Sequence, residues 1–235
     1  MKFSIVIPAL NEAKNIKRGI KALQQQTISR DQYEIVVIDN LSKDGTVKVA
    51  RQAGADIVVS QNLKGTNFAR QKGVEVSSGK IVAFLDADCV PGHDWLEKIE
   101  TNLLRPGVAG VSGPYDYGFR GLNALAAWFF NVLLLPRLGT LVYFIFGRKM
   151  GIMIFGNSAI WRSAIKKIGG LPPLAFWGDD SATAALLSRR VGKVVFDPHL
   201  IVKSSPRRFD KEGLFKLQKK YAQAFFKVYF SKDYE

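Results

Sequence analysis

The sequence predicts an α/β fold built on a doubly wound, mixed and mainly parallel sheet. Short apolar runs, such as Ile81–Leu85, alternate along the first half of the chain with segments of helical periodicity. These runs are too short for helices and suit strands that are buried on both faces. Acidic residues follow two of the runs directly, and ligands of open α/β sheets collect at the carboxyl ends of the strands.

The first elements are expected at the very start of the chain. An apolar run over 3–7 predicts a strand that ends at Pro8, and residues 11–25 have apolar side chains at helical spacing. The later strands are expected at 33–38, 56–60, 81–85, 108–113 and 194–196, and the later helices at 47–53, 67–76, 94–98, 180–190 and 214–230. Strands that alternate with helices in this way imply right-handed, parallel connections.

Composition sets the broad class of the protein. The chain has 235 residues, of which 47% are hydrophobic, so we expect one domain over 1–235 rather than a disordered chain. The formal charge of +14 indicates an anionic partner, either a nucleotide, a nucleic acid or an acidic membrane surface. A single cysteine excludes an intramolecular disulfide and favours a reducing compartment. The first residues do not read as a signal peptide, because the apolar run stops at Pro8.

Two carboxylates, Asp86 and Asp88, follow the strand expected at 81–85 and are separated by one alanine. Extended backbone with a period of two would point both side chains the same way. Two such acids repel each other unless a cation lies between them, and Mg²⁺ or Mn²⁺ is the hard ion that carboxylates favour. The alternative is an acidic turn in which Asp88 caps the helix expected at 94–98.

Four segments in order resemble the family 2 inverting glycosyltransferases. They read S-I-V-I-P-A-L-N-E, E-I-V-V-I-D-N-L-S-K-D-G-T, G-T-N-F-A-R-Q-K-G-V and I-V-A-F-L-D-A-D, and the match extends from Ser4 to about Asp94. Neither G-x-G-x-x-G in the first turn nor a P-loop motif is present. The resemblance implies the GT-A type fold of nucleotide-diphospho-sugar transferases. Residues 1–113 would then form the nucleotide-sugar-binding half, and 114–235 the acceptor half.

The resemblance also implies a donor site with named residues. Asp39 would hydrogen-bond the nucleotide base, most often a uracil, and Asp86 and Asp88 would form a metal motif for Mn²⁺ or Mg²⁺, with Asp88 as the direct ligand. The remaining donor-binding residues would be Pro8, Ala9, Asn11 and Glu12 at the nucleoside, and Lys64 and Arg70 near the diphosphate. The residue types agree, because a carboxylate accepts a base N–H and arginine pairs with phosphate.

Two later segments carry further candidates. W-G-D-D-S begins at Trp177 and resembles the family's G-E-D motif, which implies Asp180 as the catalytic base and Asp179 as the alternative. The neighbouring carboxylate is expected to raise the pKa of Asp180, although two acids at a helix start are also ordinary capping residues. K-S-S-P-R-R-F begins at Lys203 and implies that Arg207 or Arg208 holds the leaving pyrophosphate.

His199 has two readings. It could be a third metal ligand, as in some other transferases of this fold, or a structural histidine. Its position in the sequence favours the structural role.

Two segments suggest contact with a membrane. Residues 122–146 are strongly apolar with basic flanks but too short to span a bilayer, and helix 214–230 is basic and amphipathic. We therefore expect a cytoplasmic protein on the inner face of the cell membrane, acting on a sugar or lipid-linked acceptor. For 122–146, expected as a helical insertion, the alternatives are a cover over the sheet or an oligomer interface. For helix 214–230 the alternative is packing on the domain.

Two other functions compete with glycosyl transfer. A nucleotidyltransferase of the same fold would carry a basic, glycine-rich loop after its first strand, where this chain has P-A-L-N-E. A nonenzymatic nucleic-acid binder would interleave exposed aromatic residues with basic ones, whereas here the aromatics cluster in the apolar runs. We therefore expect no nucleic-acid partner. The sugar, the acceptor and the linkage are not determined by these motifs.

Overall fold

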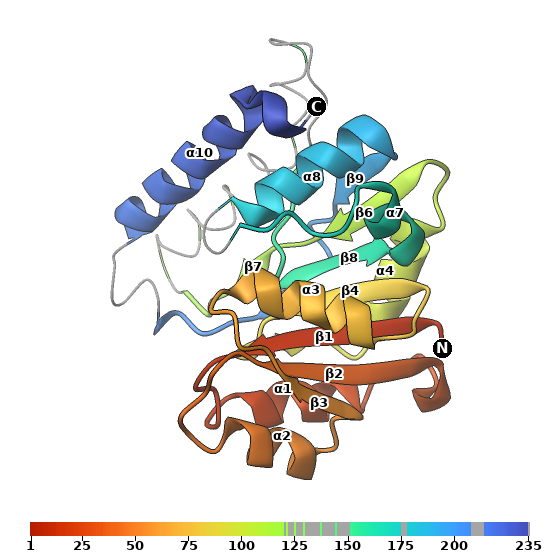
Figure 1. The fold of residues 1–235 in the computed structure, drawn as a ribbon, viewed down its shortest axis with the longest axis vertical. Helices are drawn as coiled ribbons and strands as arrows, with labels where there is room; N and C mark the ends of the chain where they lie inside the picture. Colours follow the sequence, from red (N-terminus) through yellow and green to blue (C-terminus); the bar gives the residue numbers. More distant parts are fainter. Residues whose placement is uncertain are drawn as a thin grey trace.

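A single seven-stranded sheet forms the centre of the protein (Figure 1). The computed structural model describes residues 1–119, 151–174, 178–207 and 214–234, and the single positions 121, 125, 129, 137 and 144. The strands follow the order β3-β2-β1-β4-β8-β6-β9. Their bounds are β1 Phe3–Ala9, β2 Tyr33–Asp39, β3 Ile57–Ser60, β4 Ile81–Leu85, β6 Val108–Ser112, β8 Asn157–Trp161 and β9 Lys193–Phe196. All neighbouring strands are parallel except β8, which is antiparallel to β4 and β6. The predicted mixed, mainly parallel sheet is confirmed.

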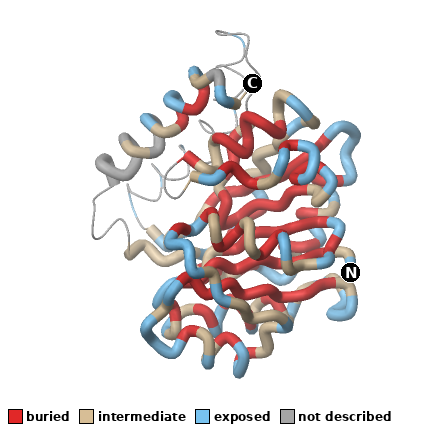
Figure 2. The backbone as a smooth tube through the Cα atoms, viewed as in Figure 1, coloured by how far each residue is buried: buried red, intermediate tan, exposed pale blue. Residues whose placement is uncertain are grey.

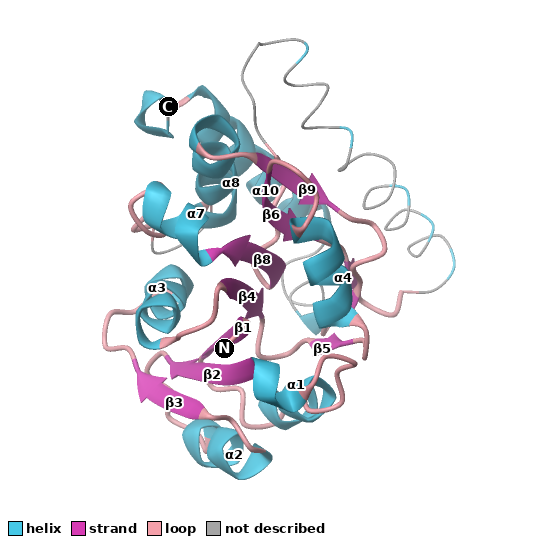
Figure 3. Ribbon diagram, turned by 90° about the vertical axis from the view of Figure 1, so that its right-hand side faces the viewer, coloured by secondary structure: helices cyan, strands magenta, loops and turns pink. Residues whose placement is uncertain are grey.

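Helices cover both faces of this sheet (Figure 3). One face packs against α1 Ile16–Leu23, α2 Thr46–Ala53 and α4 Trp95–Leu103, and the other against α3 Thr66–Val76, α7 Arg162–Lys167 and α8 Asp179–Arg190. Along β1, Ile5 and Ile7 belong to the first core, and Val6 between them belongs to the second. All of β1, β2 and β4 is buried, as their mainly apolar sequences predict (Figure 2). Two polar exceptions, Ser4 and Glu34, hydrogen-bond each other at 2.6 Å.

A small sheet lies beside the main one and was not predicted. It pairs β10 Val202–Lys203 with β5 Val90–Pro91 and with β7 Tyr115–Asp116. Through β10, the chain returns late in the sequence to the segment that follows the two strand-end acids. The 3₁₀ turns Arg30–Gln32 and Lys232–Tyr234 complete the described elements.

Two expectations about local structure were wrong, and one strand was not expected. The first helix starts at Ile16 rather than at Asn11, because Asn11 has a left-handed backbone (φ 56°) and the chain turns before the helix begins. The helix expected at 94–98 continues to Leu103, and its N-cap is Asp94 rather than Asp88. The segment around Gly156–Arg162 contains strand β8, which the sequence did not predict because its apolar run is short.

The last helix, α10 Leu214–Phe230, packs on the domain. Its buried residues Phe225, Val228 and Tyr229 form a core cluster with Ala182 and Ala185 of α8. This contact confirms the packing alternative for that face of α10. Of the predicted apolar segment 122–146, only positions 125, 129, 137 and 144 are described, so the segment's predicted membrane role lies outside the described residues. None of the described helices is both long and apolar enough to cross a membrane.

Candidate active site

Asp39 lies at the carboxyl end of β2, opposite Ala9 of β1. Its side chain is buried, and Oδ2 accepts a hydrogen bond from the Ser42 backbone N–H at 3.3 Å. The other oxygen, Oδ1, is buried and has no hydrogen-bond partner among the described residues. A buried acceptor without a partner is costly, so this atom fits a ligand that donates an N–H group.

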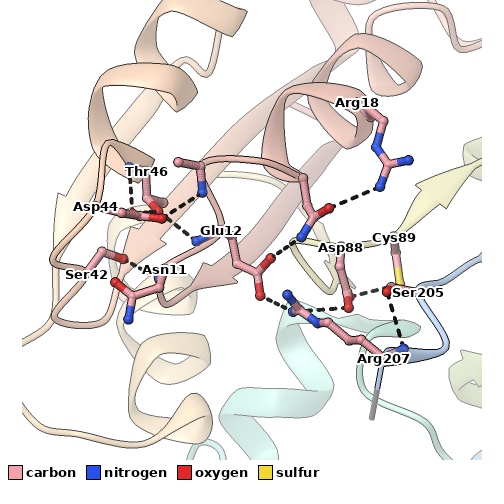
Figure 4. Close-up of polar contacts among 12 residues, drawn as sticks. Asn11, Glu12, Arg18, Ser42, Asp44, Thr46, Asp88, Cys89, Ser205 and Arg207 are labelled. Carbon is pink, nitrogen blue, oxygen red and sulfur yellow. Dashed lines mark hydrogen bonds and ion pairs between the residues drawn. The ribbon is translucent and has the colours of Figure 1, made fainter. Parts of the chain in front are cut away.

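The turn that follows β1 is tied to the turn that follows β2 (Figure 4). Asn11 donates its backbone N–H to Ser42 Oγ at 2.9 Å, and its side-chain oxygen accepts from the Lys43 N–H at 2.8 Å. The Glu12 N–H donates to Thr46 Oγ1 at 2.8 Å. Asn11 and Glu12, predicted to bind the nucleoside, therefore lie at the same sheet edge as Asp39. Pro8 and Ala9, the other two predicted nucleoside residues, are the last residues of β1.

The two strand-end acids contact different partners. Asp86 accepts a hydrogen bond on each oxygen, from Arg70 Nη2 at 3.0 Å on Oδ1 and from the Tyr115 hydroxyl at 3.0 Å on Oδ2. Asp88 Oδ2 instead lies 3.2 Å from Arg207 Nη2. Strand β4 ends at Leu85, so the period of two that predicted a shared direction stops before either acid.

Arg207 bridges two parts of the site. Its Nη2 pairs with Glu12 Oε1 as well as with Asp88, and the other oxygen of Glu12 accepts from Asn15 Nδ2 at 2.8 Å (Figure 4). The two carboxylates together therefore hold one guanidinium by charge-assisted contacts. Its predicted neighbour in function, Arg208, lies outside the described residues.

Arg70 is buried between two acids. Nη1 donates to Asp179 Oδ2 at 2.8 Å, Nη2 donates to Asp86 Oδ1, and the guanidinium lies 4.7 Å from the Phe155 ring centre. Burial lowers the pKa of Arg70, but the charges of Asp179 and Asp86 oppose this, and the pKa ends above its usual value. Arg70 was predicted near the diphosphate; in the structure it joins β4 to α8.

Asp180 lies in the first turn of α8, immediately after Gly178 and Asp179. Burial and the negative charge of Asp179 raise its pKa to about 7, against the opposing hydrogen bond that Asp180 Oδ1 accepts from the Ser181 N–H at 2.7 Å. A carboxylate with a pKa near neutrality is suited to general-base catalysis. The contribution of Asp179 agrees with the prediction, and burial is the larger cause.

Lys64 lies in the connection between β3 and α3, where its side chain is exposed. The backbone of Gln61, at the start of this connection, donates to the Asp39 carbonyl at 2.8 Å. Lys64 therefore follows the same sheet edge as the predicted base-binding acid.

Sequence reasoning missed two residues that shape this edge. The Tyr115 hydroxyl holds Asp86, and burial raises the pKa of that hydroxyl well above its usual value, so it stays a donor. Gly156 lies against the same pair, because a Cβ there would overlap both Asp86 Oδ2 and the Tyr115 oxygen. The only early signal was the glycine just before the short apolar run of β8.

The side chains fit a divalent cation only in combination with a phosphate ligand. No group of three or more His, Cys, Asp or Glu side chains in the described part of the chain could hold a metal ion. His199 is exposed, and its backbone N–H donates to Asp197 at 2.9 Å. Mg²⁺ commonly uses one or two carboxylates together with substrate phosphates, and Asp88 meets that requirement. Both acids have partners, but Asp86 is held by the buried Arg70 and by Tyr115, whereas the Arg207 side chain beside Asp88 is 41% exposed.

The comparison with protein families decides the class. The family model described as "Glycosyl transferase family 2" matches residues 4–169. This chain belongs to glycosyl transferase family 2. A curated relative, glycosyltransferase AglE of Haloferax volcanii, is 39% identical over 121 residues, which is 49% of this chain and 40% of AglE.

Solved glycosyltransferases share the fold. The mannosyltransferase PcManGT of Pyrobaculum calidifontis, solved with GDP-Man and Mn²⁺, matches with a TM-score of 0.70 at 22% identity, over 96% of this chain and 64% of its own. Glucosyl-3-phosphoglycerate synthase of Mycobacterium tuberculosis, solved with Mg²⁺ and UDP, has a TM-score of 0.64 at 21% identity, over 97% of this chain and 79% of its own. The predicted GT-A type fold is confirmed. This family 2 chain spans less than two thirds of both AglE and PcManGT.

Proposed function

We propose that this chain transfers a sugar, with inversion, from a nucleotide-diphosphate sugar to an acceptor hydroxyl. One observation carries the proposal: Arg70 joins Asp86, at the end of β4, to Asp179, which adjoins Asp180. Asp86, at the proposed donor site, and Asp180, whose pKa is about 7, therefore lie at the same edge of the sheet. An inverting transfer requires this pairing, because a base serves the acceptor while positive groups stabilise the departing diphosphate.

The donor is expected to bind at the ends of β1, β2 and β4. Asp39 Oδ1, which has no hydrogen-bond partner among the described residues, is assigned to the N3–H of a uracil and so to a UDP-linked donor. Lys64 and Arg207 are assigned to the diphosphate, which Arg207 reaches once it leaves Asp88. Asp88 is the proposed direct ligand of Mn²⁺ or Mg²⁺, in combination with diphosphate oxygens. A bound divalent cation supplies positive charge that stabilises the leaving diphosphate.

The proposed transfer couples removal of one proton to a displacement at the anomeric carbon of the sugar. Asp180 accepts the proton of the acceptor hydroxyl as the acceptor oxygen forms a bond to the anomeric carbon. The bond from that carbon to the diphosphate breaks at the same time, and the nucleoside diphosphate leaves with the electron pair. Arg207 pairs with the charge that develops on the leaving group once it releases Asp88.

Membrane association is a second part of the proposal. On α10, Phe226 and Phe230 are 42% and 53% exposed beside the exposed Lys227, while their neighbours pack on α8. Exposed aromatics next to a basic residue suit the surface of an anionic membrane, where a lipid-linked acceptor would be found. Membership of glycosyl transferase family 2 favours glycosyl transfer over a nucleotidyltransferase or a nucleic-acid binder.

The donor assignment is tested by thermal shift with UDP, GDP and dTDP, each with and without MnCl₂. A nucleotide at about 100 times its dissociation constant adds roughly 2.7 kcal/mol of stability, which is visible as a higher Tm. UDP with Mn²⁺ is expected to give the largest shift. Equal shifts with and without Mn²⁺ would refute the metal assignment, a larger shift with GDP would refute the uracil assignment, and no shift with any nucleotide would refute the proposed function.

A further inference from the structure

Asn40 follows Asp39 directly and is almost fully buried, with 4% of its surface exposed. Its side-chain amide makes three hydrogen bonds to one short segment, residues 61–65, named the 61–65 loop below. Nδ2 donates to the Gln61 carbonyl at 3.0 Å and to the Leu63 carbonyl at 2.7 Å, and Oδ1 accepts from the Gly65 N–H at 2.9 Å. Every polar atom of this side chain is therefore used to hold the loop.

The 61–65 loop connects β3 to α3 and carries Lys64 between two residues that Asn40 holds. Gly65 has a φ of 145°, in a region that residues with a side chain rarely adopt, so the loop backbone at this point is specific. Lys64 itself is exposed at the sheet edge of Asp39. Asn40 thus lies between the acid assigned to the base and the lysine assigned to the diphosphate.

We propose that Asn40 is a positioning residue of the donor site: it holds the 61–65 loop so that Lys64 meets the diphosphate of a donor whose base is bound by Asp39. This inference rests on the proposed function. An amide suits the task because the loop offers two carbonyl acceptors and one N–H donor, and only an amide presents two donors and an acceptor together. A carboxylate of the same shape would face both carbonyls with negative charge and add that charge beside the diphosphate.

The test compares UDP with uridine, which lacks the diphosphate. Calorimetric titrations in the presence of Mg²⁺ are made on the parent, Asn40→Ala, Lys64→Ala and the double variant. We expect Asn40→Ala to weaken UDP binding about tenfold or more, as the loss of a charge-assisted hydrogen bond would, and to change uridine binding less than about twofold. The double variant should bind UDP no more weakly than Lys64→Ala alone, because both changes remove the same contact.

Two measurements separate positioning from a general loss of structure. Hydrogen exchange on Asn40→Ala should show loss of protection at the Gly65 amide while the amides of β1 and β2 stay protected. If Asn40→Ala does not fold, Gly65→Ala displaces the same loop without a change in β2 and should give the same selective loss of UDP binding.

The outcomes differ for each idea. Equal weakening of UDP and uridine, or effects of Asn40→Ala and Lys64→Ala that multiply, would overturn the positioning role of Asn40. Unchanged UDP binding in both Asn40→Ala and Gly65→Ala would overturn it as well. A parent protein that binds neither UDP nor uridine would instead refute the proposed donor site, and this inference with it.

Discussion

The guanidinium of Arg207 lies 3.2 Å from Asp88 Oδ2, so a residue from the late basic segment contacts the acid proposed to bind the metal ion. The same nitrogen pairs with Glu12 in the turn after β1. A cation on Asp88 and the charge of Arg207 would repel each other at this distance. Donor binding is therefore expected to move Arg207 from Asp88 to the diphosphate.

Removal of Arg207 should change metal and nucleotide binding in opposite directions. In Arg207→Met, Mn²⁺ alone should bind more tightly than in the parent because no guanidinium competes for Asp88. UDP with Mn²⁺ should bind about 10- to 100-fold more weakly, since one charged phosphate contact is lost. Thermal shift and calorimetry measure both effects, with the exposed Arg105→Met as the control. Weaker Mn²⁺ binding in Arg207→Met would contradict the competition.

Asp180→Asn keeps the shape of the side chain and removes the proposed base. Transfer is expected to fall about 10² to 10⁴-fold, whereas donor binding in the presence of metal should barely change. Steady-state rates and a UDP titration on the same preparation separate the two properties. Asp179→Asn, the same change at the adjacent carboxylate, is the variant for comparison. A parent-like rate in Asp180→Asn would place the base elsewhere, and a loss of UDP binding would assign Asp180 to the nucleotide site.

The pH dependence of transfer follows from the raised pKa of Asp180. A base must be deprotonated, so kcat/KM should rise with pH through a midpoint near 7, the pKa of this carboxyl in the folded protein. Asp179→Asn removes a negative charge beside it, and the midpoint should move to lower pH. Rate profiles from pH 5 to 9 on both proteins measure the shift. An unchanged or higher midpoint in Asp179→Asn would argue against Asp180 as the titrating group.

The same pKa predicts a change in stability with pH. The folded protein binds the Asp180 proton more tightly than the unfolded chain, whose pKa is near 3.8. The contribution of this group to stability is therefore complete below pH 4 and is lost as the pH rises toward 7. Urea unfolding at pH 5 and pH 8 should therefore show a smaller difference in stability between the two pH values in Asp180→Asn than in the parent. An equal difference in both proteins would contradict the raised pKa of Asp180.

Arg70 is expected to matter for stability as well as for the site. Arg70→Met leaves Asp86 and Asp179 without their buried partner, which should lower the free energy of unfolding by about 3 kcal/mol. Lys72→Met breaks an exposed ion pair with Glu75 and should cost less than about 1 kcal/mol. Urea denaturation gives both values. Similar costs for the two variants would show that burial adds little to the Arg70 pairs.

Membrane contact through α10 is tested with liposomes. Because Phe226 and Phe230 are exposed beside Lys227, the protein should sediment with anionic vesicles, less so at high salt. Phe226→Ser with Phe230→Ser should reduce this binding, whereas Leu104→Ser, at an exposed position after α4, should not. A parent protein that does not sediment with anionic vesicles at low salt would overturn the proposed membrane role of Phe226 and Phe230.

Much of the sheet could be predicted because β1, β2 and β4 are short, mainly apolar segments. A strand that is buried on both faces requires mainly apolar side chains on each face. Strand β8 could not be predicted in the same way, since its antiparallel place between β4 and β6 depends on distant partners rather than on its own pattern. The same holds for the two-residue strands of the small sheet.

The residue pattern alone indicated which charged side chains lie at the strand ends, because a buried apolar run is followed by charge where its strand ends. Asp39 is the last residue of β2, and Asp86 directly follows β4. Which of these charges meet depends on how the folded elements pack. Arg70 reaches Asp179 across 109 residues of sequence, and Arg207 reaches Glu12 across 195. Such pairs carry no periodic signal, because they form only when separate elements pack side by side. The assignment of Arg70 to an ion-pair bridge therefore had to come from the packed protein.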